Sequence, residues 1–305
     1  MLTDLALDVM NVVFVFEVDE PQNLPRYLFS SVRGAWGAAL KRISCVSRGR
    51  KTCLECPFHW DCAYGYLFET PRPQDSERMK LYPYVPHPFA VAPPYPPPYE
   101  SPLEIEFTLV GRGIDFFPHV VLAMESTGKK GLGPKRVPMR LASIREEGRE
   151  LLRKGEILLP LVKSNYEVRE AKEVEATFVT PTKLKFCERE VVPHSLEFHI
   201  FLRNLLRRVS SLCYFHGGKE LEADFKGFIE AAKRIEIGER KLEWVSFRRR
   251  SSRTGQAFRL SGFTGKVVFH GDITPFTPFM ELGSLVHVGK STGFGLGKYE
   301  WRILA

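Results

Sequence analysis

The sequence lacks the features that a membrane or secreted protein needs. No apolar run approaches the roughly 20 residues with which a helix spans a bilayer. The first ten residues, MLTDLALDVM, carry aspartates but no lysine or arginine, which excludes the basic start of a signal peptide. We therefore expect a soluble, cytoplasmic protein that does not bind a membrane, and we expect its cysteines to stay out of disulfides.

Negative charge is also scarce, and its deficit is uneven. Lysine and arginine number 44 against 36 aspartates and glutamates, which gives a net charge of +8. Residues 172–305 hold 22 of the basic residues but only 15 of the acidic ones, whereas residues 1–171 are nearly balanced. A basic excess of this kind favours a polyanionic partner. The composition thus predicts a nucleic-acid-binding protein whose second half carries most of the attraction.

The first half of the chain reads as a mixture of strands and helices. Residues 11–18 are β-branched and aromatic, which is typical of a buried strand. A helix should follow, because Asn23 can cap it, Pro25 suits its first turn, and apolar residues then recur at helical spacing as far as Ile43. Nine prolines between positions 83 and 102 are too many for a helix or a central strand, so we expect an extended surface loop. The other elements expected here are strands over 103–110, 137–144 and 157–162 and a helix over 116–125.

The second half predicts the order β-α-(α)-β-β-α-β, which is that of a ferredoxin-like domain. Ser195 can cap its first helix, and Gly217 can end it. The expected strands cover 174–186, 241–250, 257–269 and 298–304, and the expected helices cover 195–216, 221–235 and 278–286.

The two halves also resemble each other. Helix, GKKGLGPKR and strand near 116–144 match helix, GKSTGFGLGKY and strand near 278–304. We therefore expect an α+β chain of tandem ferredoxin-like (RRM-like) domains over 1–172 and 173–305, with a cysteine-rich insertion at 45–62 and a proline-rich insertion at 83–102. A single large α+β domain is the alternative.

The glycine-rich stretch GKSTGFGLGKY is the densest signal in the chain. Its glycines permit positive φ and let main-chain amides approach a phosphate, while two lysines add charge. The segment leads from a helix into a strand, which excludes a P-loop and a dinucleotide fingerprint. A tight helix-to-strand turn without a ligand is the other interpretation. The RNA-binding candidates here are Gly289, Lys290, Gly293, Gly295, Gly297 and Lys298.

Two further basic clusters are candidates for nucleic-acid binding. One lies between two expected strands, where a hairpin should form, and arginine suits RNA because it pairs with phosphate and stacks on bases. The other lies in the first half. A solvated turn is the alternative for both. The candidates are Arg248, Arg249, Arg250 and Arg253, and then Lys129, Lys130, Lys135 and Arg136.

Four of the six cysteines lie close together in the pattern C-x7-C-x2-C-x5-C. A C-x2-C pair is the usual start of tetrahedral thiolate ligation, so we expect a structural zinc site, with an iron–sulfur cluster or four reduced thiols as the alternatives. The remaining two, Cys187 and Cys213, are expected in the core. The proposed ligands are Cys45, Cys53, Cys56 and Cys62.

The stretch LGSLVHVGKSTGFGLGKYEWRIL resembles the glycine-rich signature of the RAMP superfamily of CRISPR-associated proteins. More narrowly, the chain resembles the sixth Cas family, the endoribonucleases that process precursor crRNA. Further segments occur in that family's order. They are LFSSVRGAWGAALKRISC, CAYGYLFE, FVTPTKLKF, RRRSSRTGQ and LSGFTGKVVFHGDI.

This resemblance implies two ferredoxin-like domains that bind CRISPR repeat RNA along basic surfaces, with other Cas effector subunits as further candidate partners. It also implies cleavage without a metal or other cofactor. A ribose 2′-hydroxyl attacks the adjacent phosphate, which leaves a 2′,3′-cyclic phosphate and a 5′-hydroxyl. The protein must then supply a base, an acid and cations for the charged transition state.

The family's usual general base is a histidine near the first helix, but residues 24–43 contain no histidine. Two others have suitable chemistry, because an unperturbed imidazole titrates near pH ~6.5. They are His287, just before the glycine-rich stretch, and His59, inside the cysteine cluster, with Tyr27 and Lys41 as supporting candidates. Structural roles are the alternative for both histidines.

Two other functions stay open. A non-catalytic RNA-binding RAMP subunit of a CRISPR effector complex is favoured by the missing histidine. A metal-stapled nucleic-acid-binding scaffold is supported only by the charge and the cysteines.

Overall fold

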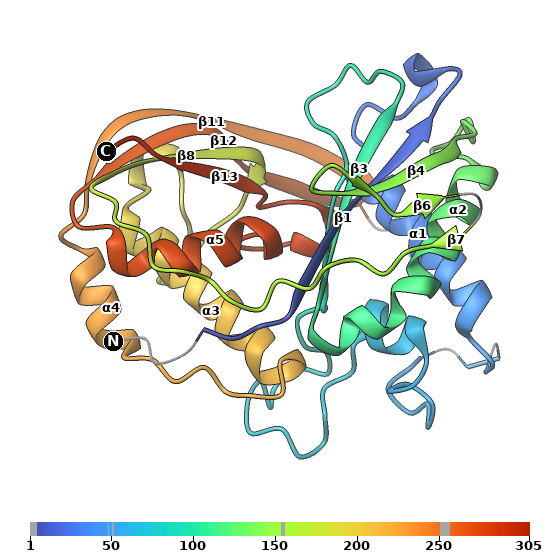
Figure 1. The fold of residues 1–305 in the computed structure, drawn as a ribbon, viewed down its shortest axis with the longest axis horizontal. Coiled ribbons are helices and arrows are strands. Elements are labelled where there is room, and N and C mark those ends of the chain that lie inside the picture. Colours follow the sequence, from blue (N-terminus) through green and yellow to red (C-terminus); the bar gives the residue numbers. More distant parts are fainter. Residues whose placement is uncertain (1–4, 48, 51, 154–155, 251–256) are drawn as a thin grey trace. The chain divides into compact units, whose positions relative to one another are not determined.

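The computed structural model describes residues 5–47, 49–50, 52–153, 156–250 and 257–305 (Figure 1). They form two compact units, each built from helices and an antiparallel sheet. The N-terminal unit is Val9–Val162, and the C-terminal unit is Lys163–Ala305 together with residues 5–8. An α+β chain of two domains is therefore confirmed, and a single large domain is excluded.

The N-terminal unit has the β-α-β-β-α-β order of a ferredoxin-like domain. Its sheet runs β2-β3-β1-β4-β5, and every neighbouring pair is antiparallel. Two short strands, β6 and β7, pair with each other. The bounds are β1 (Val9–Glu17), α1 (Phe29–Ser44), β2 (Phe89–Ala92), β3 (Leu103–Val110), α2 (Phe117–Lys130), β4 (Arg140–Glu146), β5 (Arg149–Glu150), β6 (Leu152–Arg153) and β7 (Glu156–Ile157).

An aromatic core holds α1 on this sheet. Trp36 on α1 is 1% exposed, and its ring centroid lies 4.8 Å from that of Phe89 on β2 and 5.0 Å from that of Phe107 on β3. Edge-to-face contacts of this kind add to the burial of large apolar surfaces. The apolar stripe read from the sequence is therefore the face of α1 that the sheet covers.

The C-terminal unit repeats the same order. Its sheet runs β11-β12-β8-β13, again antiparallel throughout, and Figure 1 shows α3 and α5 on one face of it. The core brings Phe178 of β8 within 4.8 Å of Phe263 of β12, ring to ring. The bounds are β8 (Glu173–Thr182), β9 (Lys185–Phe186), β10 (Arg189–Glu190), α3 (Phe198–His216), α4 (Phe225–Ala232), β11 (Glu236–Arg250), β12 (Ala257–His270), α5 (Thr277–Val286) and β13 (Tyr299–Ile303).

Two helices begin later than their capping residues suggested. Asn23 does not cap α1, because its side-chain amide donates to the Glu20 carboxylate over 2.6 Å within a short 3-10 turn, and the helix starts at Phe29. The Ser195 hydroxyl is held by the backbone of Val192 in another 3-10 turn, so α3 starts at Phe198. At both places the side chain forms a local hydrogen bond within a 3-10 turn instead of capping the helix.

Other expected elements are shorter than predicted. The α4 helix is Phe225–Ala232 rather than 221–235, because Asp224 caps it by accepting a hydrogen bond from the Gly227 amide over 2.8 Å. Of the strand expected at 157–162, only Ile157 is in a strand, as the second residue of β7. The cysteine expected in the core at position 187 is exposed in the β9–β10 turn, whereas Cys213 is buried as expected.

The proline-rich segment contains a strand that the sequence did not predict. Four residues between Pro88 and Pro93 are free of proline, and they form β2 at the edge of the sheet. Because β2 pairs only with β3, its other side needs no backbone donors, and flanking prolines are tolerated there.

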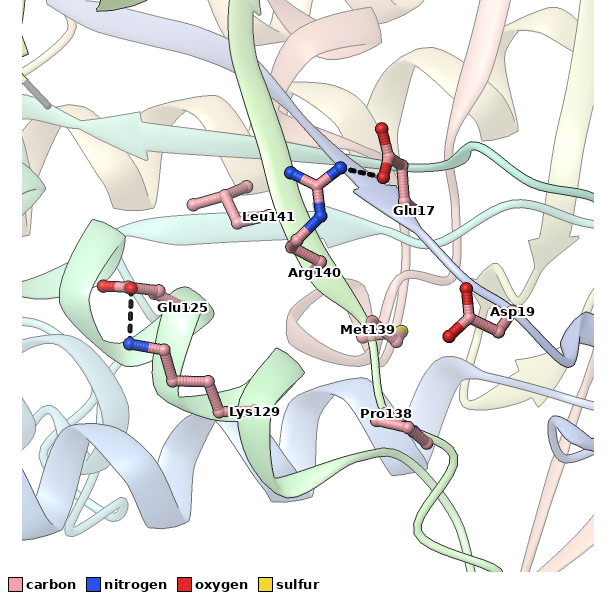
Figure 2. A pocket seen from close by; sticks show the side chains of 8 residues that line it. All are labelled: Glu17, Asp19, Glu125, Lys129, Pro138, Met139, Arg140 and Leu141. Atoms are coloured by element: carbon pink, nitrogen blue, oxygen red, sulfur yellow. Dashed lines mark hydrogen bonds and ion pairs between the residues drawn. The ribbon is translucent and has the colours of Figure 1, made fainter. Parts of the chain in front are cut away.

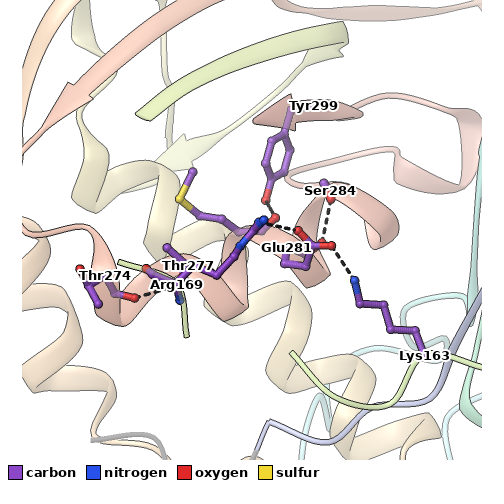
Figure 3. Close-up of polar contacts among 8 residues, drawn as sticks. Lys163, Arg169, Thr274, Thr277, Glu281, Ser284 and Tyr299 are labelled. Atoms are coloured by element: carbon purple, nitrogen blue, oxygen red, sulfur yellow. Dashed lines mark hydrogen bonds and ion pairs between the residues drawn. The ribbon is translucent and has the colours of Figure 1, made fainter. Parts of the chain in front are cut away.

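The segment before β8 belongs to the C-terminal unit, as Figure 3 shows. Lys163 Nζ lies 2.6 Å from a carboxylate oxygen of Glu281 on α5, and the Arg169 amide donates to the Thr277 hydroxyl over 2.9 Å. These contacts set the boundary between the units at 162/163, ten residues before the expected one.

Candidate nucleic-acid interface

The glycine-rich segment, defined here as residues 287–298, connects α5 to β13. The Val288 amide donates to the Gly297 carbonyl over 2.9 Å, which closes the segment on itself. The Lys290 amide donates to the Lys183 carbonyl over 2.9 Å, and the Gly297 amide donates to the Pro181 carbonyl over 3.2 Å. The segment is therefore fixed against the end of β8 rather than hanging free.

Two glycines are required by this close approach. Gly289 has φ of 86° and Gly297 has φ of 79°, a region that other residues rarely enter. A Cβ at Gly289 would collide with the Lys183 carbonyl, and one at Gly297 would collide with the Val288 carbonyl. These glycines serve the architecture of the segment. The sequence analysis predicted that these glycines allow another backbone to approach closely. The backbone that does so is that of Lys183 and Val288 in the same chain.

Between these glycines the backbone makes a turn at residues 291–293 that has the handedness of an anion-binding nest, and we call it the nest. Ser291 is left-handed, with φ of 63° and ψ of 29°, and the 3-10 turn Thr292–Phe294 follows. Successive left- and right-handed residues point three consecutive amides into one concavity. Within the described residues, the amides of Ser291, Thr292 and Gly293 have no hydrogen-bond partner. This arrangement can accept a phosphate oxygen.

Three cations lie near one another at the glycine-rich segment. Lys290 is exposed, and its pKa is lowered by partial burial and then by the nearby charges of Arg207 and Lys185. Like charges gather at one place only at an electrostatic cost, which a bound anion would relieve. Glu188 compensates in part, since its carboxylate lies 3.7 Å from Lys185 Nζ. The geometry suits a phosphodiester.

The sequence analysis missed Lys185 and Arg207 as members of this site. A usable signal existed, because Arg207 follows Arg203 by four residues on the polar face of α3. Lys185 had no comparable signal, since only the fold brings β9 beside the glycine-rich segment. Of the residues that were expected here, Lys298 is half-buried, and burial lowers its pKa, while Gly295 has φ of 98°.

His287 has a structural setting that does not fit the catalytic role expected of it. The side chain is 1% exposed, and Nδ1 donates to the Leu296 carbonyl over 3.2 Å. Burial, together with the nearby charge of Arg208, lowers the pKa of His287 to about 3. A neutral imidazole closed off from solvent has no path by which to exchange protons with a substrate.

His287 should make the protein lose stability as the pH falls. The pKa rises from about 3 in the folded chain to 6.5 in the unfolded chain, so below pH 6.5 the unfolded state binds a proton that the folded state does not. The free energy of unfolding then falls by up to about 1.4 kcal/mol per pH unit. We expect His287→Gln to flatten this fall between pH 6.5 and 4.5 in urea unfolding. Equal slopes in both proteins would refute the buried neutral imidazole.

The basic turn of the N-terminal unit follows α2. Leu132 and Val137 close it by two reciprocal backbone hydrogen bonds of 2.9 and 3.0 Å. The Lys135 ammonium donates to the Asn23 side chain over 2.7 Å. All four candidates of this turn are exposed, which RNA contact requires. They are Lys129, Lys130, Lys135 and Arg136.

A cavity of about 280 Å³ in the same unit weakens the attraction of this turn (Figure 2). Glu17, Asp19 and Glu125 line it, against the cations of Lys129 and Arg140. Lys129 pairs with Glu125 over 2.6 Å, and Arg140 pairs with Glu17. Carboxylates outnumber cations around this cavity, so a phosphate is attracted less strongly here than at the glycine-rich segment.

The β11–β12 hairpin carries the third basic cluster. Arg248 is exposed and lies opposite the exposed Arg259. Trp244 is 39% exposed and Phe258 46% exposed on the same two strands. Exposed aromatic rings among arginines are typical of surfaces that stack the bases of single-stranded RNA. The side chains of Arg249 and Arg250, and the whole of Arg253, lie outside the described residues.

The supporting catalytic candidates do not come together. Tyr27 precedes α1 and stacks on Tyr95, with ring centroids 6.4 Å apart. Lys41 lies in the last turn of α1, where its ammonium sits 5.3 Å from the ring centroid of Tyr64. The helix rises by roughly 18 Å between Phe29 and Lys41 at 1.5 Å per residue, so the two residues lie toward opposite ends of α1.

His59 has the ring tautomer that a general base needs. Its Nδ1 donates to the Cys56 carbonyl, which places the lone pair on Nε2. The ring is half-buried beside Trp60, at a centroid distance of 4.9 Å. Within the described residues, Nε2 has no hydrogen-bond partner, so it is available to a substrate.

His87 is a polar residue that the sequence analysis missed. It lies in the proline-rich segment, and both of its ring nitrogens are bound. Arg33 on α1 donates to Nε2 over 3.2 Å, and Nδ1 donates to the Thr70 hydroxyl over 2.9 Å. The neutral tautomer thus orients the Arg33 guanidinium. Nothing in the proline pattern could have shown this.

The clustered cysteines follow the end of α1 and precede a short π-helix, Tyr64–Glu69. Burial, then the Glu69 carboxylate and the neighbouring thiols, raise the pKa of Cys53 to about 11. Among the described residues, no group of three or more His, Cys, Asp or Glu side chains is placed to hold a metal ion. The structure gives the zinc or iron–sulfur site no support, and elemental analysis with a visible spectrum remains its test.

Two family models match the two halves of this duplicated ferredoxin-like fold. Residues 7–166 match AF_1859_N, described as an N-terminal domain. Residues 176–299, which include the whole glycine-rich segment, match the CRISPR-associated endoribonuclease Cas6. The chain belongs to the AF_1859_N family, whose model covers more than half of it, and its C-terminal part is similar to the Cas6 family.

Solved structures agree with this fold. Thermus thermophilus Cas6 (TTHB231) is 18% identical, with a TM-score of 0.59 over 97% of this chain and 99% of that one. The Cas6 (TTHA0078) product complex is 18% identical, with a TM-score of 0.56 over 97% and 99%. A partial Cas6-RT-Cas1--Cas2 complex is 12% identical, with a TM-score of 0.54 over 99% of this chain and 47% of that one. A comparison with curated proteins gives no match.

Among the described residues, none of the helices is both long and apolar enough to span a bilayer.

Proposed function

We propose that the chain is an endoribonuclease that cleaves precursor crRNA within its repeats. The match of residues 176–299 to the Cas6 model carries this proposal. The turn at Ser291–Gly293 and the cations near it support the proposal, because they lie within the residues that match the Cas6 model and suit an RNA phosphate.

The proposed reaction needs no metal. A ribose 2′-hydroxyl loses its proton and attacks the adjacent phosphorus, and the bond to the 5′ oxygen of the next nucleotide breaks. The products are a 2′,3′-cyclic phosphate and a 5′-hydroxyl, which takes up a proton. Lys290 and Arg207 are suited to bind a backbone phosphate of the RNA, since both carry cations at the glycine-rich segment.

Of the expected catalytic residues, we propose His59 for proton transfer. Its Nδ1 bond fixes the tautomer and leaves Nε2 as a base. His59→Ala should slow single-turnover cleavage about a hundredfold or more, in line with the usual effect of removing a general base. His194→Ala, which changes a histidine of the C-terminal unit, is the matched control and should cleave like the wild type.

Cleavage of repeat RNA in EDTA tests the proposed function. We expect one cut site, with a 2′,3′-cyclic phosphate on the upstream product, in a reaction that EDTA does not slow. Tight, sequence-selective binding without cleavage would instead identify a non-catalytic RNA-binding subunit. Binding without any preference for repeat RNA would contradict both and leave a nucleic-acid-binding scaffold.

A further inference from the structure

Arg208 is a buried cation on α3. The residue is 9% exposed, and its Nε donates to the Val286 carbonyl, the last of α5, over 3.3 Å. Burial lowers the pKa of Arg208 to about 10. Since that value is still well above neutral pH, the guanidinium keeps its charge inside the protein.

No anion compensates this charge within the described residues. Arg208 forms no ion pair there, and its Nη2 is buried without a hydrogen-bond partner. Buried arginines are usually paired, because an uncompensated charge and an unsatisfied donor both cost stability. The α5 carbonyl offsets part of this cost through the negative end of the helix dipole.

The position of Arg208 connects it to the nest. Its neighbour Arg207 is exposed and donates to the Asn204 side chain over 3.2 Å, and Asn204 in turn donates to the Lys185 carbonyl over 3.0 Å. The Lys290 amide donates to the Lys183 carbonyl two residues earlier, so the outer side of this turn of α3 adjoins the strand end that holds the glycine-rich segment. Arg208 itself lowers the pKa of His287, the first residue of the glycine-rich segment. The same turn of α3 thus carries Arg207 on its exposed side and Arg208 on its buried side, and both lie near the glycine-rich segment.

We propose that Arg208 is a positioning residue whose buried charge strengthens phosphate binding at the nest without touching the RNA. The inference rests on the proposed function. A buried charge is screened by salt much less than an exposed one, so its field persists at the segment under physiological conditions. Through Val286 it also fixes where the segment leaves α5. The cost in stability is retained because it serves binding.

Three substitutions separate charge from hydrogen bonding. Arg208→Met removes both, Arg208→Gln keeps a donor for the Val286 carbonyl, and Arg208→Lys keeps the charge. Melting temperature is measured for each, together with the Kd for a repeat RNA that carries a 2′-deoxy nucleotide at the cut site. Each Kd is taken from about 50 to 200 mM salt.

We expect Arg208→Met to raise the melting temperature by about 2 °C or more, since replacing an unpaired buried ion by an apolar side chain is stabilising. Its Kd should rise about tenfold, and Arg208→Gln should show the same rise. Arg208→Lys should stay within about threefold of the wild type. The slope of log Kd against log salt should not change, because a buried cation releases no counterion.

A lower melting temperature in Arg208→Met with an unchanged Kd would overturn the proposal and leave Arg208 as a structural cap of α5. Equal Kd values for Arg208→Lys and Arg208→Gln would also overturn it. These results are distinct from failure of the proposed function, in which the wild type itself would not bind repeat RNA. In that event sulfate should still raise the melting temperature of the wild type more than that of Arg208→Met, and an equal rise would refute the inference.

Discussion

Arg207→Glu/Lys290→Glu should weaken the binding of repeat RNA about a hundredfold or more. Each exposed cation at a phosphate contributes on the order of 1–2 kcal/mol, and 1.4 kcal/mol is a factor of ten. Reversal adds repulsion to the loss of attraction. The effect should be large because Arg207 lies near enough to lower the pKa of Lys290, so that a phosphate bound between them is attracted by both cations.

The matched control makes the same change of charge elsewhere in the unit. Lys226→Glu/Arg234→Glu alters one lysine and one arginine on and just after α4, both exposed. This variant should bind within about threefold of the wild type at 150 mM salt, because its charges are screened beyond about 8 Å. The salt slope should fall by about 2 for the nest variant and by much less for the control. Equal losses in the two would mean that only net charge matters and that the nest is not the phosphate seat.

Gly297→Ala should destabilise the C-terminal unit by about 2 kcal/mol or more and abolish cleavage. The φ of 79° costs any residue with a Cβ about 1–2 kcal/mol, and that Cβ would in addition collide with the Val288 carbonyl. The Val288–Gly297 hydrogen bond, which closes the segment, must then open. The nest depends on that closure, so RNA binding should fall along with stability.

Gly34→Ala is the control for that substitution. Gly34 lies within α1, and a Cβ there would meet nothing within 4 Å. Alanine is favoured over glycine in a helix by about 1 kcal/mol, so this variant should melt higher and cleave normally. Thermal unfolding and single-turnover cleavage report both effects. A Gly297→Ala protein with wild-type melting and cleavage would show that the segment tolerates a wider opening than its contacts indicate.

Periodicity was enough to predict the fold. Strands alternate with amphipathic helices in the ferredoxin-like order, and the aromatic stripe through Trp36 marks the covered face of α1. Helix starts were predicted less well, since Asn23 and Ser195 had local partners that a sequence does not reveal. The edge strand β2 was not predicted, because the prolines on both sides of its four residues indicated a loop.

The site was predictable only where a single segment carried it. The glycine pattern predicted close backbone approach, which the contacts of Gly289 and Gly297 confirm, while the RNA-binding role predicted for Lys290 stays a prediction. Whether His287 faces solvent or core depends on how α3 and α5 pack, and no periodicity in the segment reports that. Lys185 reaches the nest across a tertiary contact, through Lys183, so a long-range pairing had to be known first.

The repetition of one topology in both units has a consequence for how such a chain diversifies. The backbone of the turn after α2 is closed by the two hydrogen bonds between Leu132 and Val137, and a side-chain hydrogen bond from Lys135 to Asn23 ties it to the segment before α1. Its counterpart after α5 leans on the carbonyls of Pro181 and Lys183. When one topology occurs twice in a chain, the two copies need not carry the same function. The backbone of the glycine-rich segment is fixed by its neighbours, which restricts changes in its length. The turn after α2 has fewer such restrictions on its length and charge. We therefore expect new specificity to arise first in the N-terminal turn.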